Sequence, residues 1–254
     1  MEPLFKFRHL SEVRNHGVQI FPYHFTKNYK QEDIQVYHDD ECGMHFVLQE
    51  GRRLYFKKKW SANRIKKSFH DLTLEQDEMS PHRYLSNDFD LDENDVLADF
   101  GAAEGNFTLA VIDRIKKAYL FECDPEWIEA LEMTFRPWKD KVEIVPKFVS
   151  DKNDEKHCSG DVFFKDKAIS FLKIDVDGGE RGLLNGFEKI IQQTPNMKIA
   201  LCTYHQHNDE HEFTEMLTKM NYSVTPSRGY MIFHYDKKIK SPFIRRALIR
   251  AQKK

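Results

Sequence analysis

From residue 95 onward, apolar and polar positions follow each other in a pattern that predicts strands and helices in turn. An apolar run at 96–98 stops at Asp99, and apolar residues then recur at helical spacing over 107–115. A second apolar run at 118–121 stops at Glu122. Strands that alternate with helices indicate a mainly parallel sheet with right-handed crossovers. Further strands are expected at 142–149, 171–175 and 197–203, and further helices at 125–137, after 175 and at 209–220.

Residues 1–70 form a mixed stretch that is rich in aromatic and charged side chains and lacks a clear helical period. Alternating residues at 44–48 and 53–56 flank Glu50-Gly51, which predicts a β-hairpin. A helical pattern within 61–85 continues as far as Pro81. We therefore expect a mixed extension that contains a hairpin and a helix.

Two features are expected near the C-terminus. Strands at 222–225 and 230–235 predict an antiparallel hairpin. Residues 237–254 contain eight Lys or Arg and no acid, and their apolar positions from Phe243 to Ala251 fit one stripe of a helix. Such a helix either docks on the rest of the chain with a solvated basic face or touches an anionic membrane surface, where each cation adds about 1 kcal/mol.

The turn after the first core strand has the composition of a nucleoside-binding loop. Gly101 and Gly105 bracket it, and Glu122 follows 21 residues after Gly101. Glycines let the backbone approach a ligand, and the carboxylate can accept both ribose hydroxyls. Ala103 replaces a glycine of the dinucleotide fingerprint, and the acid Asp99 would repel a phosphate. The ammonium and sulfonium groups of S-adenosylmethionine suit that acid, so the sequence favours this cofactor over NAD.

Composition narrows the class of protein. The net charge of −2 argues against a protein that coats nucleic acid, and 40% hydrophobic residues can form a substantial core. The four cysteines are far apart and contain no C-x-x-C pair, which predicts reduced thiols rather than disulfides or a zinc site. No apolar run approaches the length of a membrane span, and no secretory segment opens the chain. A cytoplasmic location is therefore expected.

The segment from Phe171 to Gly186, FLKIDVDGGERGLLNG, resembles the hallmark of the FkbM-type methyltransferases, L-K-I-D-V-E-G-x-E followed by L-x-G. Asp177 stands where that family usually has Glu, which shortens the side chain by one methylene and keeps the charge. The resemblance spans roughly residues 75–235. It departs from the family at Gly160-Asp161, where Leu-Asp is usual, and at a short connection over 151–168.

Three further stretches agree with the same family. Residues 99–109 are similar to its cofactor loop, 120–125 to its F-E-x-x-P strand end, and 203–205 to its fifth-strand Tyr-His. The resemblance implies a class I, Rossmann-like methyltransferase with a mainly parallel seven-stranded sheet and a C-terminal antiparallel hairpin. The expected domains are an N-terminal extension at 1–90, a catalytic domain at 91–236 and a basic tail at 237–254.

The resemblance also implies S-adenosylmethionine as cofactor, bound where the carboxyl ends of the parallel strands meet. Asp99 and the loop after it would hold the methionine moiety, and Glu122 the ribose. Ser150 and Asp151, after the third strand, would meet the adenine amino group. The expected cofactor-binding residues are Asp99, Gly101, Ala102, Ala103, Glu104, Gly105, Asn106, Phe107, Glu122, Cys123, Ser150 and Asp151.

Methyl transfer from a sulfonium requires the protein to align an acceptor and to take its proton. The expected catalytic residues are Asp175, Asp177 and His205. In one interpretation His205 or Asp175 is the general base. In another, Asp175 and Asp177 bind Mg²⁺ or another divalent cation that acidifies a vicinal diol. Asp177 can equally cap the next helix or pair with Lys173 or Arg181, and Glu180 at that helix start suits the macrodipole.

The sequence therefore predicts an S-adenosylmethionine-dependent O-methyltransferase that acts on a hydroxyl of a saccharide, glycoconjugate or natural product. An RNA or protein methyltransferase of the same fold is one alternative. Against base N-methylation, Asp175-Val-Asp-Gly178 stands where an N/D-P-P-Y/F motif would be. A non-catalytic nucleotide-binding domain is a second alternative, although Asp99, Glu122 and Asp175 are intact. An NAD-dependent oxidoreductase lacks the third glycine. The expected partner is a small-molecule or glycan acceptor, with no nucleic acid.

Overall fold

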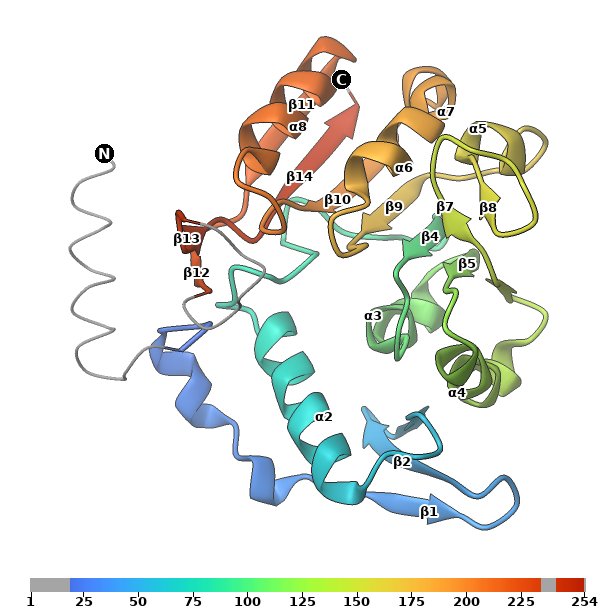
Figure 1. Ribbon diagram of the computed structural model, residues 1–254, viewed down its shortest axis with the longest axis vertical. Coiled ribbons are helices and arrows are strands. Elements are labelled where there is room, and N and C mark those ends of the chain that lie inside the picture. Colours follow the sequence, from blue (N-terminus) through green and yellow to red (C-terminus); the bar gives the residue numbers. More distant parts are fainter. Residues whose placement is uncertain (1–18, 234–240, 254) are drawn as a thin grey trace.

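The computed structural model describes residues 19–233 and 241–253, and a seven-stranded sheet forms its centre (Figure 1). The strand order is β11-β14-β10-β9-β4-β5-β6. The strands from β10 to β6 are parallel, whereas β14 is antiparallel to both of its neighbours. Chain order reverses between β4 and β9, which is where open α/β sheets bind ligands. The strands are β4 (Val96–Phe100), β5 (Lys117–Phe121), β6 (Val142–Val145), β9 (Phe171–Ile174), β10 (Lys198–Cys202), β11 (Tyr222–Pro226) and β14 (Leu248–Lys253).

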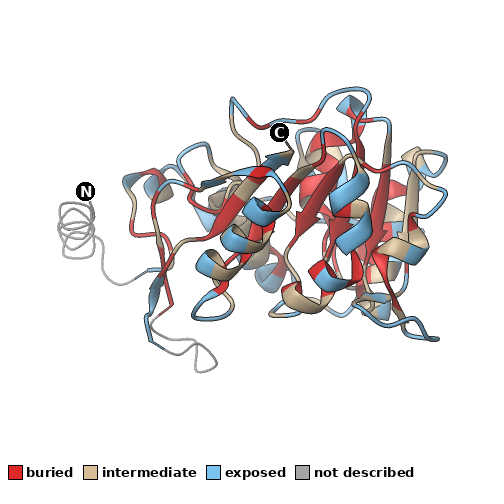
Figure 2. Cartoon of the chain, turned by 90° about the horizontal axis from the view of Figure 1, so that it is seen from above, coloured by how far each residue is buried: buried red, intermediate tan, exposed pale blue. Residues whose placement is uncertain are grey.

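Helices cover both faces of this sheet, and each strand therefore buries side chains in two directions. In β4, Leu97 packs on one side with Leu109 and Leu131, while Phe100 packs on the other side with Phe187. Figure 2 shows the buried strands enclosed by helices with exposed outer faces. One face carries α2 (Ala62–Gln76), α3 (Asn106–Val111) and α4 (Pro125–Phe135), and the other carries α5 (Gly160–Phe163), α6 (Glu180–Gly186), α7 (Glu188–Gln193) and α8 (Asp209–Lys219).

The N-terminal residues form the expected hairpin as part of a three-stranded antiparallel sheet. It consists of β1 (Tyr37–Asp39), β2 (Met44–Gln49) and β3 (Arg52–Tyr55). The turn at Glu50 and Gly51 has positive φ at both positions, as the tight turns that suit strand twist require. Met44 of this sheet packs into the same hydrophobic core as α3 and α4, so the extension is joined to the main sheet through α4. Short 3₁₀ turns lie at His24–Asn28 (η1), Gln31–Asp33 (η2), Ile112–Arg114 (η3) and Arg136–Trp138 (η4).

The expected C-terminal helix and hairpin are both wrong. The basic segment forms β14, which enters the main sheet between β10 and β11. Strand β11 therefore pairs with β14, and β12 (Met231–Ile232) pairs with β13 (Ile244–Arg245). Leu248 packs toward one face of the sheet and Ile249 toward the other, so both are buried in an extended strand. Such a short apolar run fits a helical stripe and a buried strand equally well. The parts of the tail at 237–240 and 254 lie outside the described residues.

The third strand of the sheet ends earlier than expected. Strand β6 stops at Val145, and the next strand, β7 (Phe148–Val149), pairs with β8 (His157–Cys158) in a separate two-stranded sheet. Pro146 stands between β6 and β7, and proline cannot donate a ladder hydrogen bond. Over 19–233 and 241–253, no helix has the length and apolar composition that crossing a bilayer requires.

Candidate active site

The turn between β4 and α3 crosses directly over the end of β9. Gly101 and Ala102 donate backbone hydrogen bonds to Phe121 O at 3.1 and 3.2 Å. Gly101 has a φ of 70°, and a Cβ there would lie 2.1 Å from the backbone oxygen of Asp175. Glycine is therefore required at this position for both its backbone angle and its close approach. The turn and the residue after β9 are held against each other.

The position of Asp99 differs from the expected contact between its carboxylate and the methionine moiety of the cofactor. Its side chain is 1% exposed. Oδ1 lies 2.9 Å from Lys173 Nζ, and Oδ2 accepts a 2.7 Å hydrogen bond from Thr108 Oγ1. Lys173 also donates to Gly101 O at 2.8 Å. The buried ion pair therefore holds the turn in place through Lys173. Because Lys173 and Thr108 occupy the Asp99 carboxylate, direct contact between Asp99 and a methionine moiety is not supported.

Glu122 lies beside the same turn and organises it. Its Oε1 accepts backbone hydrogen bonds from Cys123 at 2.7 Å and Asp124 at 2.9 Å, and its Oε2 accepts one from Ala103 at 3.0 Å. Glu122 lines a cavity of about 500 Å³ at the carboxyl ends of the strands. That volume is within the range of small-molecule sites. The cavity is lined by Phe100, Gly101, Ala103, Phe121, Glu122, Cys123, Asp124, Trp127, Lys147, Phe148, Val149, Asp175, Val176, Asp177, Gly179 and Tyr204.

The expected cofactor residues divide into two groups around this cavity. Gly101, Ala103, Glu122 and Cys123 line it. The others from the loop support it from outside the lining. Among these, buried Glu104 accepts a 3.2 Å hydrogen bond from Ser68 of α2, and burial raises the pKa of the Glu104 carboxyl. The loop residues outside the lining are Ala102, Glu104, Gly105, Asn106 and Phe107.

Ser150 and Asp151 do not line the cavity either. They were expected there because the third strand was predicted to extend to residue 149. Since β6 ends at Val145, the residues after it that line the cavity are Lys147, Phe148 and Val149. The Ser150 hydroxyl instead accepts a 3.1 Å hydrogen bond from the backbone of Lys152.

Asp175, directly after β9, is held by two tyrosine hydroxyls. Tyr84 donates a 2.9 Å hydrogen bond to its Oδ2, and Tyr204 donates a 3.1 Å hydrogen bond to its Oδ1. Burial alone would raise the pKa of Asp175. The nearby His82, Lys173 and His205 outweigh that effect and hold its pKa below the ordinary value. Asp175 is therefore an oriented anion in the lining of the cavity.

His205, after β10, is surrounded by acids. Its Nδ1 lies 2.9 Å from Glu180 Oε1, and its Nε2 lies 3.5 Å from Asp175 Oδ1 and 3.6 Å from Asp177 Oδ1. Burial alone would lower the pKa of His205, but Asp177, Glu180 and Asp175 raise it to about 10. An imidazole must be neutral before it can act as a general base. The expected role of His205 as a base is therefore not supported, because its acid neighbours favour the imidazolium form.

Two residues beside Asp175 were not predicted as site residues. His82 is buried, with its Nε2 3.7 Å from Asp175 Oδ2, and burial lowers the pKa of His82 to about 4. Tyr84 precedes the first core strand by twelve residues, and no motif marks either residue. Tyr204 carried a signal, because it stands next to His205 in the Tyr-His pair.

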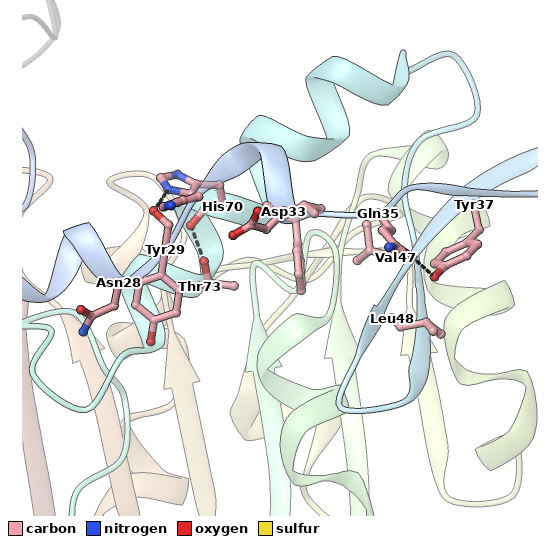
Figure 3. A pocket seen from close by; sticks show the side chains of 12 residues that line it. Asn28, Tyr29, Asp33, Gln35, Tyr37, Val47, Leu48, His70 and Thr73 are labelled. Carbon is pink, nitrogen blue, oxygen red and sulfur yellow. Dashed lines mark hydrogen bonds between the residues drawn. The ribbon is translucent and has the colours of Figure 1, made fainter.

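A second cavity, in the N-terminal extension, has a different character (Figure 3). It lies between η2, β2 and α2, and its lining shares no residue with the cavity at the sheet edge. His70 is there, with Nε2 3.4 Å from the backbone oxygen of Tyr29. The titratable side chains that converge on Asp175 are absent from its lining. The candidate chemistry therefore belongs to the sheet edge.

Comparison with known families gives a match over the segment that contains this acid cluster. Residues 155–232 match the methyltransferase FkbM domain. The resemblance to the FkbM-type methyltransferases is confirmed. The matched range includes Asp175, Glu180 and His205. No curated protein matches the chain.

Solved structures of several methyltransferases are similar to part of this chain. A methyltransferase FkbM from Methylobacillus flagellatus is similar, with a TM-score of 0.50 and 16% identity over 64% of this chain and 44% of that one. The chain thus spans less than half the length of that FkbM protein. An rRNA methylase from Streptococcus thermophilus has a TM-score of 0.45 and 15% identity, over 64% and 89% of the two chains. N-methyltransferase NodS from Bradyrhizobium japonicum, in complex with S-adenosyl-L-homocysteine, has a TM-score of 0.43 and 9% identity, over 63% and 78%. The FkbM likeness confirms the expected Rossmann-like fold.

Proposed function

We propose that this chain transfers a methyl group from S-adenosylmethionine to a hydroxyl oxygen of a polar acceptor such as a saccharide. The observation that carries the proposal is the single cavity that joins Glu122 to Asp175 at the point where the strand order reverses. Glu122 supplies a nucleoside contact at one end. Asp175 supplies an oriented anion at the other, where the acceptor would meet the methyl group.

The hydrogen bonds of Glu122 leave room for a ribose. A carboxylate has about four acceptor positions, and the backbone N–H groups of Cys123, Asp124 and Ala103 use three of them. The remaining position, on Oε2, can accept a ribose hydroxyl. The backbone of Gly101 and Ala103 then faces the methionine part of the cofactor. Acidic side chains along the cavity favour the positive charge of that part.

The same acids disfavour an RNA acceptor. Glu122, Asp124, Asp175 and Asp177 all line the cavity. Proteins that bind nucleic acids use Lys and Arg to neutralise phosphates, and the chain as a whole has a net charge of −2. An uncharged acceptor with hydroxyl groups meets no such repulsion. We therefore favour a saccharide over an RNA.

Asp175 is the residue that we assign to the proton of the acceptor hydroxyl. Asp175→Asn should lower turnover by about 10²–10⁴-fold, the usual contribution of a general base. Cofactor affinity should stay near that of the wild type, since the cofactor contacts lie at the other end of the cavity. Exposed Asp166→Asn is the matched control and should retain full turnover.

The measurement uses a cofactor with a labelled methyl group and three sets of acceptors: neutral saccharides, RNA oligomers and peptides. The proposal predicts label in the saccharide set, lost in Asp175→Asn and kept in Asp166→Asn. Label that enters only RNA or peptide would overturn the assigned acceptor. Equal turnover of the two variants would remove Asp175 from the transfer step.

A further inference from the structure

Three potential metal ligands meet beside the cavity. Asp175 follows β9, Glu180 is the first residue of α6, and His205 follows β10. One ligand atom from each lies within 4.8 Å of the other two. Protein sites for transition metals combine imidazole nitrogen and carboxylate oxygen in this way, with three protein ligands and open positions for small molecules.

One carboxylate oxygen of Glu180 is buried without a hydrogen-bond partner in the protein. Its side chain is fully buried. Oε1 accepts backbone hydrogen bonds from Val176 at 3.1 Å and Gly178 at 3.3 Å, but Oε2 has no hydrogen-bond partner. A buried carboxylate oxygen without a partner is costly. Neither ring nitrogen of His205 makes a hydrogen bond of good geometry, although acids lie close to both.

We propose that Asp175, Glu180 and His205 bind a divalent first-row transition-metal ion such as Mn²⁺ or Zn²⁺. The nitrogen ligand favours these ions over Mg²⁺, which prefers oxygen and retains water. The ligand set differs from the Asp175 and Asp177 pair expected from the sequence, since Glu180 and His205 take the place of Asp177. Of the three ligands, Asp175 lines the cavity, so the group would hold an ion beside it.

An ion at this place would hold a hydroxyl oxygen of the acceptor and lower its pKa. This role rests on the proposed function, whereas ion binding itself does not. A second group, His82, Asp175 and Cys202, lies deeper. There the one carboxylate is Asp175, and His82 Nε2 and Cys202 Sγ already lie 3.7 Å apart as hydrogen-bond partners, whereas the first group adds the second carboxylate of Glu180, whose Oε2 has no hydrogen-bond partner. We therefore place the ion at Glu180 and His205.

The test measures bound Mn²⁺ by electron paramagnetic resonance on the full chain after EDTA treatment, with Zn²⁺ and Mg²⁺ as competitors. The expected result is one Mn²⁺ per chain, displaced by Zn²⁺ and not by equimolar Mg²⁺. Glu180→Gln keeps an oxygen for the Val176 and Gly178 hydrogen bonds and should weaken binding by at least about 10–100-fold. His205→Gln should have the same effect.

Matched controls are exposed Glu188→Gln and His207→Gln, which should bind as the wild type does. Cys202→Ser should also bind normally, and loss of binding there would move the ion to the deeper group and overturn the proposal. Absence of stoichiometric Mn²⁺ or Zn²⁺ binding by the wild type overturns it as well, even if a variant fails to fold. Calorimetry with S-adenosylmethionine in EDTA separates the two claims, because cofactor binding without ion binding refutes only the metal site.

Discussion

At the scale of single residues, Gly101 determines how closely the cofactor turn approaches the acid cluster. Its φ of 70° is one that side chains rarely adopt, and a Cβ would meet the Asp175 backbone oxygen at 2.1 Å. The left-handed region alone costs about 1–2 kcal/mol for a residue with a Cβ. The contact adds to that cost, because neither backbone segment can move without disturbing the other.

Gly101→Ala should therefore be destabilised by clearly more than the backbone angle accounts for. Gly51→Ala is the control, because Gly51 has a similar φ of 81° and no atom within 4 Å of its added Cβ. Urea unfolding of the two variants gives the comparison. We expect Gly51→Ala to lose about 1–2 kcal/mol and Gly101→Ala to lose more. Equal losses of unfolding free energy in the two variants would show that the close approach to the Asp175 backbone adds nothing to the cost of the substitution.

The sequence indicated the positions of some residues of the candidate site but not of others. Gly101, Glu122 and Asp175 lie where their motifs indicated, because strand ends and tight turns have a local sequence signature. Asp99 could not be assigned in the same way. Its partner, Lys173, comes from a strand far along the chain, and nothing local indicates that the two charges bury each other. His82 and Tyr84 likewise reach Asp175 through tertiary packing alone.

At the scale of secondary structure, β14 connects the C-terminus to the active site. The Arg250 guanidinium donates hydrogen bonds to the backbone oxygens of Arg83 at 2.5 Å, Tyr84 at 2.9 Å and Leu85 at 3.3 Å. Burial lowers the pKa of Arg250 to about 10. The strand therefore holds the segment from which Tyr84 reaches Asp175.

Arg250→Ala should lose about 1.5–3 kcal/mol of unfolding free energy, since it leaves three carbonyls without their charged donor. Its turnover should also fall, because Tyr84 would no longer be held against Asp175. The control is exposed Arg228→Ala, which should change neither quantity. Denaturant unfolding and a single-turnover assay measure the two effects. An Arg250→Ala variant as stable as the control would contradict the link between β14 and the site.

The elements that the sequence failed to predict share a physical cause. Most strands and helices between 95 and 220 were predictable from apolar runs and helical periods, whereas the short elements β7, β8 and α5 were not. The segment at 248–253 is short and buried on both faces, and its partners β10 and β11 lie elsewhere in the chain. The cations of the basic tail predicted exposure to solvent, whereas Arg250 donates hydrogen bonds to backbone carbonyls and Arg246 pairs with Glu210 at 2.9 Å. The third strand was predicted too long because Phe148 and Val149 continue its apolar pattern after Pro146.

At the scale of the whole molecule, one edge of the sheet gathers the features on which the proposed function depends. Residues from the ends of β4, β5, β6 and β9 line the cavity, and Tyr204 after β10 completes it. The N-terminal extension contributes Tyr84 and His82 and supports the cofactor turn through Ser68 and Gln49. The site is thus assembled from residues of the N-terminal extension and of the main sheet.

The central claim is that this cavity binds S-adenosylmethionine through Glu122, and titration calorimetry on the full chain tests it most directly. The account predicts one S-adenosylmethionine or S-adenosylhomocysteine per chain and no binding of NAD. Glu122→Ala should bind about 10–150-fold more weakly, which corresponds to the loss of roughly 1.5–3 kcal/mol. Glu126→Ala, four residues along in α4 and paired with Lys59 at the surface, should bind as the wild type does. Binding of NAD in place of S-adenosylmethionine, or an unchanged affinity in Glu122→Ala, would contradict the account.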